Sequence, residues 1–358
     1  MNVREFFFDL PAELIAQDPP AIRGTSRLLH LDRLTGARTH TTVDHLAEYL
    51  DPGDVVVVNN TRVFPARLLG RRVPTGGAVE CFLVRGLDEG AAVPSPTDQT
   101  WLALMHPGRK LAPGARVVFD DVNGAALHGE VLERHFHGRR TIRLWTEDGR
   151  SVHEVVDAIG HVPLPPYIRR DDRADDRDRY QTVFARERGS IAAPTAGLHF
   201  TPEILASLAS RGVSLAQLTL HVGYGTFQPV RVERVEDHRL ESEHYEVSRE
   251  AADAIETART AGRRVVAVGT TTTRTLEAVA RAHGGRVVPA AAETDLFIYP
   301  GFEFRVVTGL LTNFHLPASS LIMLVAAFGG KDGVMAAYAD AIAARYRFYS
   351  YGDAMLIT

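Results

Sequence analysis

The strongest constraint on the fold is an alternation of apolar strands and amphipathic helices between residues 191 and 346. Leu215–His221 and Val265–Val268 are apolar runs of strand length, and segments with helical spacing of their apolar residues lie between such runs. This alternation favours a mainly parallel sheet, either open or closed into a barrel. Val55–Val58 is apolar at every position, which is typical of a strand buried on both faces. The sequence therefore predicts an α/β fold.

The pattern changes between residues 63 and 157, where helix signals are nearly absent. Short β-prone segments such as 79–84, 99–105 and 141–145 are separated by turns, for example at Pro107-Gly108 and Pro113-Gly114. This pattern of short strands and turns is typical of a small antiparallel barrel or sandwich. We therefore expect a discontinuous large α/β domain, residues 1–62 and 158–358, and an inserted small β-barrel domain, residues 63–157. A length of 358 residues is consistent with about two domains.

Composition excludes several classes of protein. The formal net charge of −4 argues against a generally basic nucleic-acid binder, so any phosphate contact requires a local patch. Cys81 is the single cysteine, which excludes an intramolecular disulfide and a cysteine-rich metal site and fits a reducing cytoplasm. The histidines have no metal-ligand spacing, and no apolar run reaches the roughly 18 residues of a membrane span. We expect a cytoplasmic monomer that binds neither a metal nor a membrane.

Polar loops follow the predicted strands. Gly269–Arg274 separates a strand from a helix, and the free N–H groups of a helix N-terminus bind carboxylate or phosphate, although simple threonine capping is an alternative. Neither a P-loop nor a dinucleotide fingerprint occurs there. Arg169–Arg179 alternates charges and has no apolar residue larger than Ala174, so we expect a mobile surface loop. The strand-end residues suit binding and acid–base chemistry: Asn60, Arg62, Thr195, His199, His221, Thr226, Thr270, Arg274, Asn313 and His315.

Six motifs occur in order along almost the whole chain: Asn59–Val63, Ala193–Phe200, Leu220–Gly223 with Gly225–Phe227, Gly269–Thr271 with Arg274, Thr312–Pro317, and Tyr346–Phe348 with Ser350–Met355. Together they resemble the S-adenosylmethionine:tRNA ribosyltransferase-isomerase family of the queuosine pathway. The resemblance implies a barrel-like large α/β domain with an inserted small β-barrel. It also implies transfer and isomerisation of the ribosyl part of S-adenosylmethionine onto 7-aminomethyl-7-deazaguanine at the tRNA wobble position. The products would be epoxyqueuosine in tRNA, adenine and methionine, with S-adenosylmethionine a consumed substrate and no cofactor.

The implied chemistry suggests roles for residues in these motifs. The sulfonium acidifies the C5′ protons, so a neutral histidine can remove one; His199 and His221 are the leading candidates, with Glu243 as a third catalytic residue. Arg274 and the Thr270–Thr271 turn would hold the methionine carboxylate. The substrate-binding set is Asn60, Arg62, Thr195, Gly197, Gly223, Gly225, Thr226, Thr270, Thr271, Arg274, Asn313, His315, Tyr351 and Asp353.

Two further groups of residues are candidates for contacts with the tRNA acceptor. Phe227, Phe314 and Tyr351 could stack on a base, with core packing as the alternative. A basic face of Arg67, Arg71 and Arg72, continued by Arg62, would hold tRNA phosphates, with an ordinary solvated barrel surface as the alternative.

Four positions depart from the family pattern: Tyr224, Glu241, Thr308 and Ala318. If Tyr224 and Glu241 line the pocket, the acceptor could differ. Two alternatives therefore stay open: a paralogue that uses the same chemistry on another amine, and a tRNA-binding protein with a decayed active site. The intact loops around His199, His221 and Asn313 argue against the second.

Overall fold

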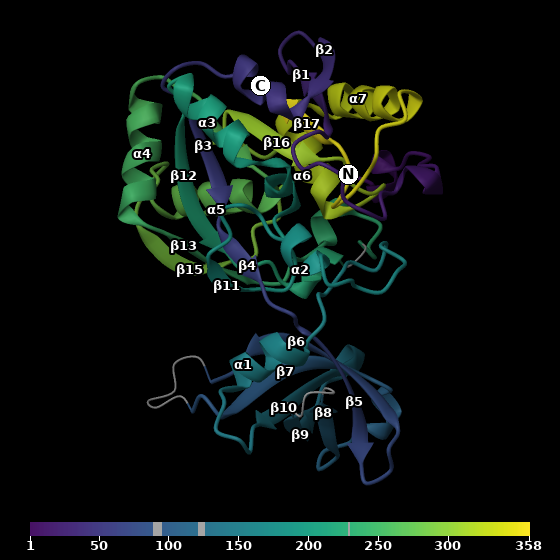
Figure 1. The fold of residues 1–358 in the computed structure, drawn as a ribbon. Coiled ribbons are helices and arrows are strands. Elements are labelled where there is room, and N and C mark those ends of the chain that lie inside the picture. The colour runs from purple at the N-terminus through teal and green to yellow at the C-terminus, as the bar shows by residue number, and fades with distance from the viewer. Residues whose placement is uncertain (89–94, 121–125, 228–229) are drawn as a thin grey trace. The chain divides into compact units, whose positions relative to one another are not determined.

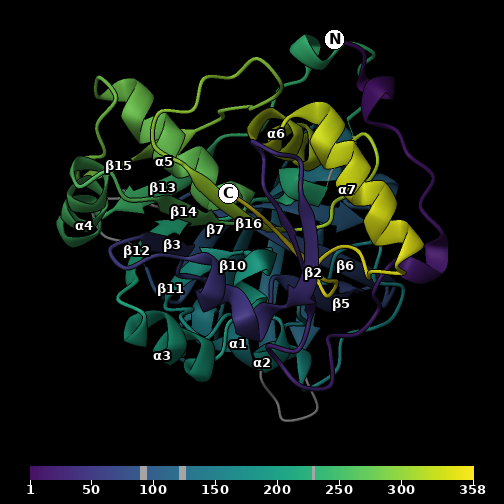
Figure 2. The same cartoon turned by 90° about the horizontal axis from the view of Figure 1, so that it is seen from above.

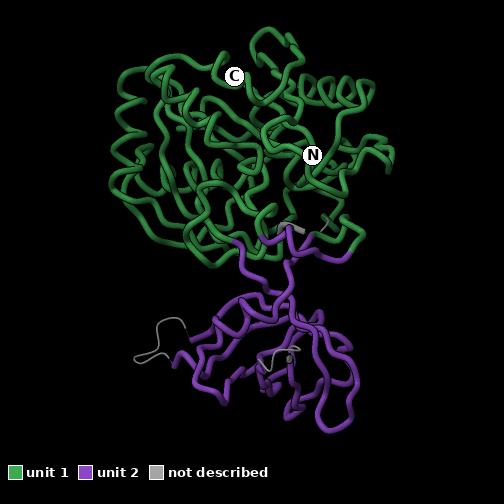
Figure 3. The backbone as a smooth tube through the Cα atoms, viewed as in Figure 1, with its two compact units in different colours: residues 1–62, 165–170, 178–358 green, residues 63–164, 171–177 purple. Residues whose placement is uncertain are grey.

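The computed structural model describes residues 1–88, 95–120, 126–227 and 230–358. The chain divides into two compact units, drawn in two colours in Figure 3: unit 1 is residues 1–62, 165–170 and 178–358, and unit 2 is residues 63–164 and 171–177. Unit 2 therefore extends to Leu164 rather than to 157 and also takes residues 171–177. The reason is a set of hydrogen bonds between distant segments: Asp172 accepts from the Val162 N–H at 3.0 Å, and Arg177 donates to the Asp157 carbonyl at 2.6 Å.

Unit 1 is built on a nine-stranded sheet with the order β15-β13-β12-β3-β14-β16-β17-β1-β2 (Figure 1). The strands are β1 (Arg27–Leu31), β2 (Arg38–Thr42), β3 (Val55–Asn59), β12 (Ser214–Leu220), β13 (Glu243–Val247), β14 (Val265–Val268), β15 (Ala290–Thr294), β16 (Gly309–Asn313) and β17 (Ala354–Ile357).

Pairing is parallel from β12 through β3 and β14 to β16, and between β1 and β17. The remaining neighbours pair antiparallel, so the predicted parallel arrangement holds only for the centre of the sheet. The antiparallel pairing of β1 with β2 has a local cause. Because β2 follows β1 after a short turn, the two strands form a hairpin, and the strands of a hairpin are antiparallel. The observed order runs from β15 to β2, which is the open form of the sheet.

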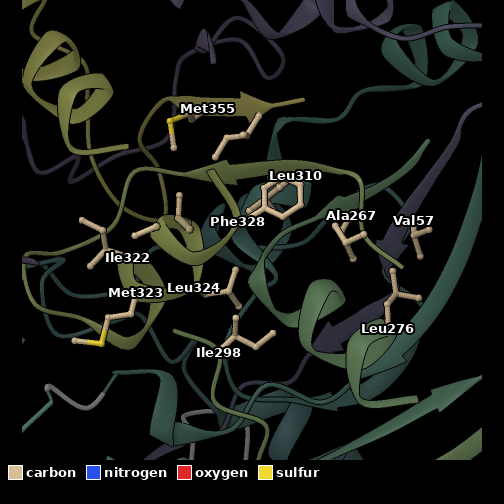
Figure 4. Close-up of a cluster of buried hydrophobic side chains, with 14 of the residues drawn as sticks. Val57, Ala267, Leu276, Ile298, Leu310, Ile322, Met323, Leu324, Phe328 and Met355 are labelled. Atoms are coloured by element: carbon tan, nitrogen blue, oxygen red, sulfur yellow. The ribbon is translucent and has the colours of Figure 1, made fainter. Parts of the chain in front are cut away.

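Helices cover both faces of this sheet, because alternate residues of its central strands point to opposite sides. Val55 and Val57 belong to one core cluster, with α4 (Arg249–Thr260), α5 (Thr270–Ala282), α6 (Ser320–Gly329) and α7 (Lys331–Ala343). Val56 and Val58 belong to the other, with α3 (Pro202–Ser210) and the short helices η3 (Val43–Tyr49) and η6 (Thr195–His199). Figure 2 shows the first set of helices on the opposite side of the strands from α3, and Figure 4 shows Val57 and Leu276 in the larger cluster.

The helix α6 is apolar because it is part of this core. Ile322, Met323 and Val325 are fully buried, and Figure 4 shows Ile322 and Met323 in the same cluster as Leu310 of β16 and Met355 of β17. No single described helix has the length and composition of a membrane span; α6 and α7 satisfy these criteria only as a pair, with a bend of 115° between them.

Unit 2 contains a closed barrel with the strand order β10-β7-β6-β5-β8-β9, in which all pairings are antiparallel. Its inward side chains, such as Leu68, Cys81 and Ile142, are fully buried. The α/β class with an inserted small all-β barrel is thus confirmed. The barrel strands are β5 (Arg67–Val73), β6 (Ala78–Gly86), β7 (Asp98–His106), β8 (Arg116–Asp120), β9 (Ala126–Arg134) and β10 (Arg139–Trp145).

The remaining elements are short. They are η1 (Val3–Phe6), η2 (Ala12–Leu14), β4 (Thr61–Val63), η4 (Gly108–Lys110), η5 (Phe136–Gly138), α1 (Val152–Ile159), α2 (Asp176–Arg179), β11 (Glu187–Ser190), η7 (Tyr224–Phe227) and η8 (Val235–Asp237).

Candidate active site

A cavity of about 480 Å³ lies within unit 1. Its walls come from segments 166–169, 192–196, 269–271, 312–321 and 349–350, with Tyr180, Val222 and Val230. Gly269 directly follows β14 and Asn313 ends β16, so the cavity is at the carboxyl ends of two neighbouring parallel strands. This is the usual position of a ligand in an α/β sheet, and the volume is in the range of small-molecule sites.

Two helix N-termini contribute to the cavity wall. The helix α5 begins at Thr270 after Gly269, whose φ of +87° is a conformation that favours glycine. The helix α6 begins at Ser320, and the Ser319 hydroxyl caps it by accepting the Ile322 N–H at 3.3 Å. Thr270, Thr271, Ser319 and Ser320 all line the cavity. Because helix N-termini carry partial positive charge and free N–H groups, this part of the wall suits an anionic group.

Asn313 connects the cavity to His199. The Asn313 amide nitrogen donates to the Tyr349 carbonyl oxygen at 3.1 Å and to His199 Nε2, also at 3.1 Å. Burial lowers the pKa of His199 to about 4, so the ring is neutral at pH 7 and its proton resides on Nδ1. His199 is only 4% exposed and borders a second, much smaller cavity of about 20 Å³ together with Tyr351. The structure therefore places Asn313, and not His199, on the main cavity wall.

His315 does line the main cavity. Its Nε2 is 2.8 Å from the Thr312 hydroxyl, and its backbone N–H donates to the Tyr338 hydroxyl at 3.0 Å. Burial lowers the pKa of His315 to about 3, so this imidazole is also neutral at pH 7. The ring is thus unprotonated and positioned on the wall, although so low a pKa makes it a weak base in the free protein.

His221 lies elsewhere in unit 1, next to β4 and β11. Its Nδ1 is 2.8 Å from the Thr61 hydroxyl, and its ring stacks on His244 at 6.2 Å between centroids. The backbone of Gly189 passes so close that a Cβ there would be 2.7 Å from the imidazole. Burial, and then the neighbouring His244, lower the pKa of His221. His221 is not among the described residues that line the cavity.

Glu243 and Arg274 form a buried ion pair. Glu243 Oε2 accepts from the Arg274 guanidinium, and Oε1 accepts the Gly223 N–H at 2.8 Å. The side chains of Arg274 and Glu243 are 9% and 6% exposed, and burial lowers the pKa of Arg274 to about 10, which leaves it charged at neutral pH. The pair therefore ties the helix α5 and the strand β13 to the loop at Gly223. Neither side chain is among the described cavity residues, whereas the Thr270–Thr271 turn is.

Two other predicted binding residues make hydrogen bonds inside the protein. Asn60 Oδ1 accepts from the Thr219 hydroxyl at 2.8 Å. Asp353 accepts from the Arg27 guanidinium at 3.0 Å and from the Arg347 N–H at 2.7 Å. Both side chains are 2% exposed, so they support the loops around the cavity.

The other predicted residues are dispersed. Gly197 is packed so closely that a Cβ would be 2.8 Å from the Thr182 side chain and 2.9 Å from the Phe184 ring. Phe314 is fully buried in the core cluster, which supports the packing alternative over base stacking. Gly225 lies in η7, and the side chains of Thr226 and Phe227 fall outside the described parts of the structure. Tyr351 is 2% exposed, and its ring meets the edge of Tyr180 at 5.9 Å.

The predicted basic face is divided between the units. Arg62 is an exposed residue of unit 1, whereas Arg67, Arg71 and Arg72 are on β5 of the barrel. Arg67 Nε donates to Glu80 at 2.8 Å, which neutralises part of its charge.

Of the predicted site residues, the cavity brings together Thr195, Thr270, Thr271, Asn313 and His315. It also uses residues that sequence reasoning missed: Tyr167, Arg169, Tyr180 and Tyr349. The available signal for Tyr349 was its place between the motif segments Tyr346–Phe348 and Ser350–Met355. The signal for Tyr167 was the extended proline-rich segment that contains it.

The fold and the cavity define an α/β small-molecule-binding protein with an inserted β-barrel. The chain belongs to the queuosine biosynthesis protein family, whose model matches residues 3–357. It is 47% identical over 357 residues to the S-adenosylmethionine:tRNA ribosyltransferase-isomerase of Desulfitobacterium hafniense, and 50% identical over 357 residues to that of Symbiobacterium thermophilum, with complete coverage of both partners in each comparison. The crystal structure of S-adenosylmethionine tRNA ribosyltransferase from Thermotoga maritima shares 38% identity, with a TM-score of 0.55 and coverage of 99% of this chain and 100% of that one. The resemblance stated from the motifs is confirmed.

Proposed function

We propose that this chain transfers and isomerises the ribosyl part of S-adenosylmethionine onto 7-aminomethyl-7-deazaguanine in tRNA, with release of adenine and methionine. The observation that carries the proposal is similarity of 47–50% along the whole chain to relatives named for this activity. Incubation of the purified protein with both substrates tests it, through the release of adenine and methionine. No cofactor or metal takes part in this reaction scheme.

Part of the cavity wall suits the carboxylate of S-adenosylmethionine. The N-termini of α5 and α6, with the guanidinium of Arg169 on the same wall, suit the methionine carboxylate. A base then takes a proton from C5′, next to the sulfonium, and the electron pair left on that carbon starts the expulsion of adenine. His315 is the candidate base on this wall, because it is neutral and lines the cavity.

The paralogue alternative depended on Tyr224 and Glu241 reaching the pocket. Neither is among the described residues that line the cavity, whereas Ala318 is. These two departures therefore give no reason to expect a different acceptor.

The tRNA contact should be detectable on β5. Reversing the charge of Arg71 and Arg72 to Glu should raise the KM for tRNA several-fold and leave the KM for S-adenosylmethionine unchanged, because neither side chain lines the cavity. Each lost phosphate contact should also reduce the slope of log affinity against log salt by about 0.9. Steady-state kinetics over a range of KCl concentrations measures both effects.

Arg143→Glu is the matched control in the same barrel. Arg143 Nε donates to Asp98 at 2.9 Å, so much of its charge is already neutralised, and we expect little change in the KM for tRNA. If the reversals at Arg71 and Arg72 behave like this control, the tRNA surface lies elsewhere.

A further inference from the structure

Three residues that line the cavity carry a buried side-chain oxygen without a hydrogen-bond partner among the described residues. The atoms are the Tyr180 hydroxyl, Oδ1 of Asn313 and the Tyr349 hydroxyl. These residues are 1%, 2% and 6% exposed. Buried polar atoms in folded proteins almost always have a partner, and an unpaired one is costly. Asn313 and Tyr349 are also joined by a hydrogen bond, so their two unpartnered atoms mark a place where a ligand completes the hydrogen bonding.

The orientation of the Asn313 amide follows from its neighbours. The Tyr349 carbonyl oxygen can only accept, so the atom that faces it at 3.1 Å must be the amide nitrogen. The second amide hydrogen is directed at His199 Nε2, which burial keeps unprotonated. Both N–H groups are thus used inside the protein, and Oδ1 remains. A ligand that meets Asn313 must offer a hydrogen-bond donor.

Tyr349 is held in an unusual conformation. Its φ is +74°, in the left-handed region that a bulky residue rarely adopts. The Tyr349 N–H donates to the Phe314 carbonyl at 2.9 Å, and the Tyr349 carbonyl accepts from both Asn313 and the Gly352 N–H. Its ring packs on Tyr167 at 4.2 Å between centroids. Backbone strain of this kind is retained mainly at functional sites.

The surroundings restrict the ligand group further. Tyr167 and Tyr349 make this part of the wall aromatic, and the described lining residues include no Asp or Glu that would balance a bound ammonium. Arg169 on the same cavity also opposes a cation. A neutral flat group with an N–H beside an acceptor atom fits better than a charged amine.

We propose that Asn313 and Tyr349 form a recognition subsite for the edge of an aminopurine-type base. Asn313 Oδ1 accepts an N–H of the base, and the Tyr349 hydroxyl donates to the neighbouring acceptor. This inference rests on the proposed function, in which two bases present such an edge: the adenine of S-adenosylmethionine and the deazaguanine of the tRNA.

Tyr349→Phe tests the subsite without disturbing the fold, because it removes a hydroxyl that has no partner within the described structure. The melting temperature should be unchanged or higher. If the subsite holds adenine, the Kd for S-adenosylmethionine by calorimetry should rise about tenfold. Wild-type protein should also bind the analogue that lacks the 6-amino group about tenfold more weakly, since Asn313 then has no donor. Tyr245→Phe, at a buried tyrosine of β13 outside the described lining, should bind S-adenosylmethionine normally.

If the subsite instead holds the acceptor base, Tyr349→Phe should bind S-adenosylmethionine normally and show a KM for tRNA about tenfold higher. A variant within about twofold of wild type in both measurements, below the effect of one hydrogen bond, would overturn the inference. Wild-type protein that fails to bind S-adenosylmethionine at all would instead contradict the proposed function, so the two failures are distinguishable.

Discussion

Replacing Arg274 with Met should lower the free energy of unfolding by about 3–5 kcal/mol, because it leaves the Glu243 carboxylate buried without its charged partner. The carboxylate would retain the Gly223 N–H as a donor, which does not balance its charge. Denaturant unfolding of the variant and of wild-type protein, followed by a probe in unit 1, measures the difference.

Two comparisons separate this cause from a general effect of losing an arginine. The double variant Glu243→Leu with Arg274→Met should recover most of the stability, since replacing both partners of a buried pair with apolar groups is often nearly neutral. Arg150→Met breaks the exposed pair with Asp148 and should change the stability by no more than about 1 kcal/mol. Wild-type stability of Arg274→Met would contradict the account of the buried pair.

Washout of deuterium from C5′ of labelled S-adenosylmethionine should be abolished in His315→Asn, while substrate binding remains measurable. Of His199, His221 and His315, His315 is the one that the structure places on the cavity wall. Each of the three rings has one nitrogen in contact with a neighbour: His199 Nε2 with Asn313, His221 Nδ1 with Thr61 and His315 Nε2 with Thr312. The position on the cavity wall is therefore what distinguishes His315.

Deuterium exchange at C5′ distinguishes the residue that removes the proton from a residue that only holds the substrate in place. His199→Gln and His221→Asn should slow washout only in proportion to any loss of substrate affinity, and the exposed His283→Asn should have no effect. Full exchange in His315→Asn would exclude His315 as the base and return the role to His199 or His221.

The sequence predicted the α/β class because local patterns carry it: the apolar run Val55–Val58 and the strand–helix alternation after residue 191. The direction of strand pairing was less accessible, since β17 pairs with β16 and β1 only after the chain has passed through α6 and α7. Residues 171–177 were assigned to the large domain because their hydrogen bonds to segment 157–162 leave no local sequence signal.

The site was predicted at the level of loops and not of side chains. The loops with Thr195, Thr270 and Asn313 do meet in one cavity, as expected of strand ends in an α/β sheet. His199 and His221 lie close to such loops but make their contacts away from the cavity, because the direction of a side chain depends on backbone angles that residue types do not reveal. Tyr349 was missed for the same reason: its role depends on a φ of +74°.

The central claim is the reaction itself. Purified protein, S-adenosylmethionine and tRNA bearing 7-aminomethyl-7-deazaguanine should release adenine and methionine in equal amounts, with a matching gain in the mass of the tRNA base. Release should require the aminomethyl base, since tRNA with guanine at that position lacks the attacking amine. Chromatography of the small molecules measures the released adenine and methionine, and mass spectrometry of the digested tRNA measures the mass gained by the base. Formation of S-adenosylhomocysteine, which would indicate methyl transfer, or release of adenine with a free amine but never with tRNA, would contradict the account.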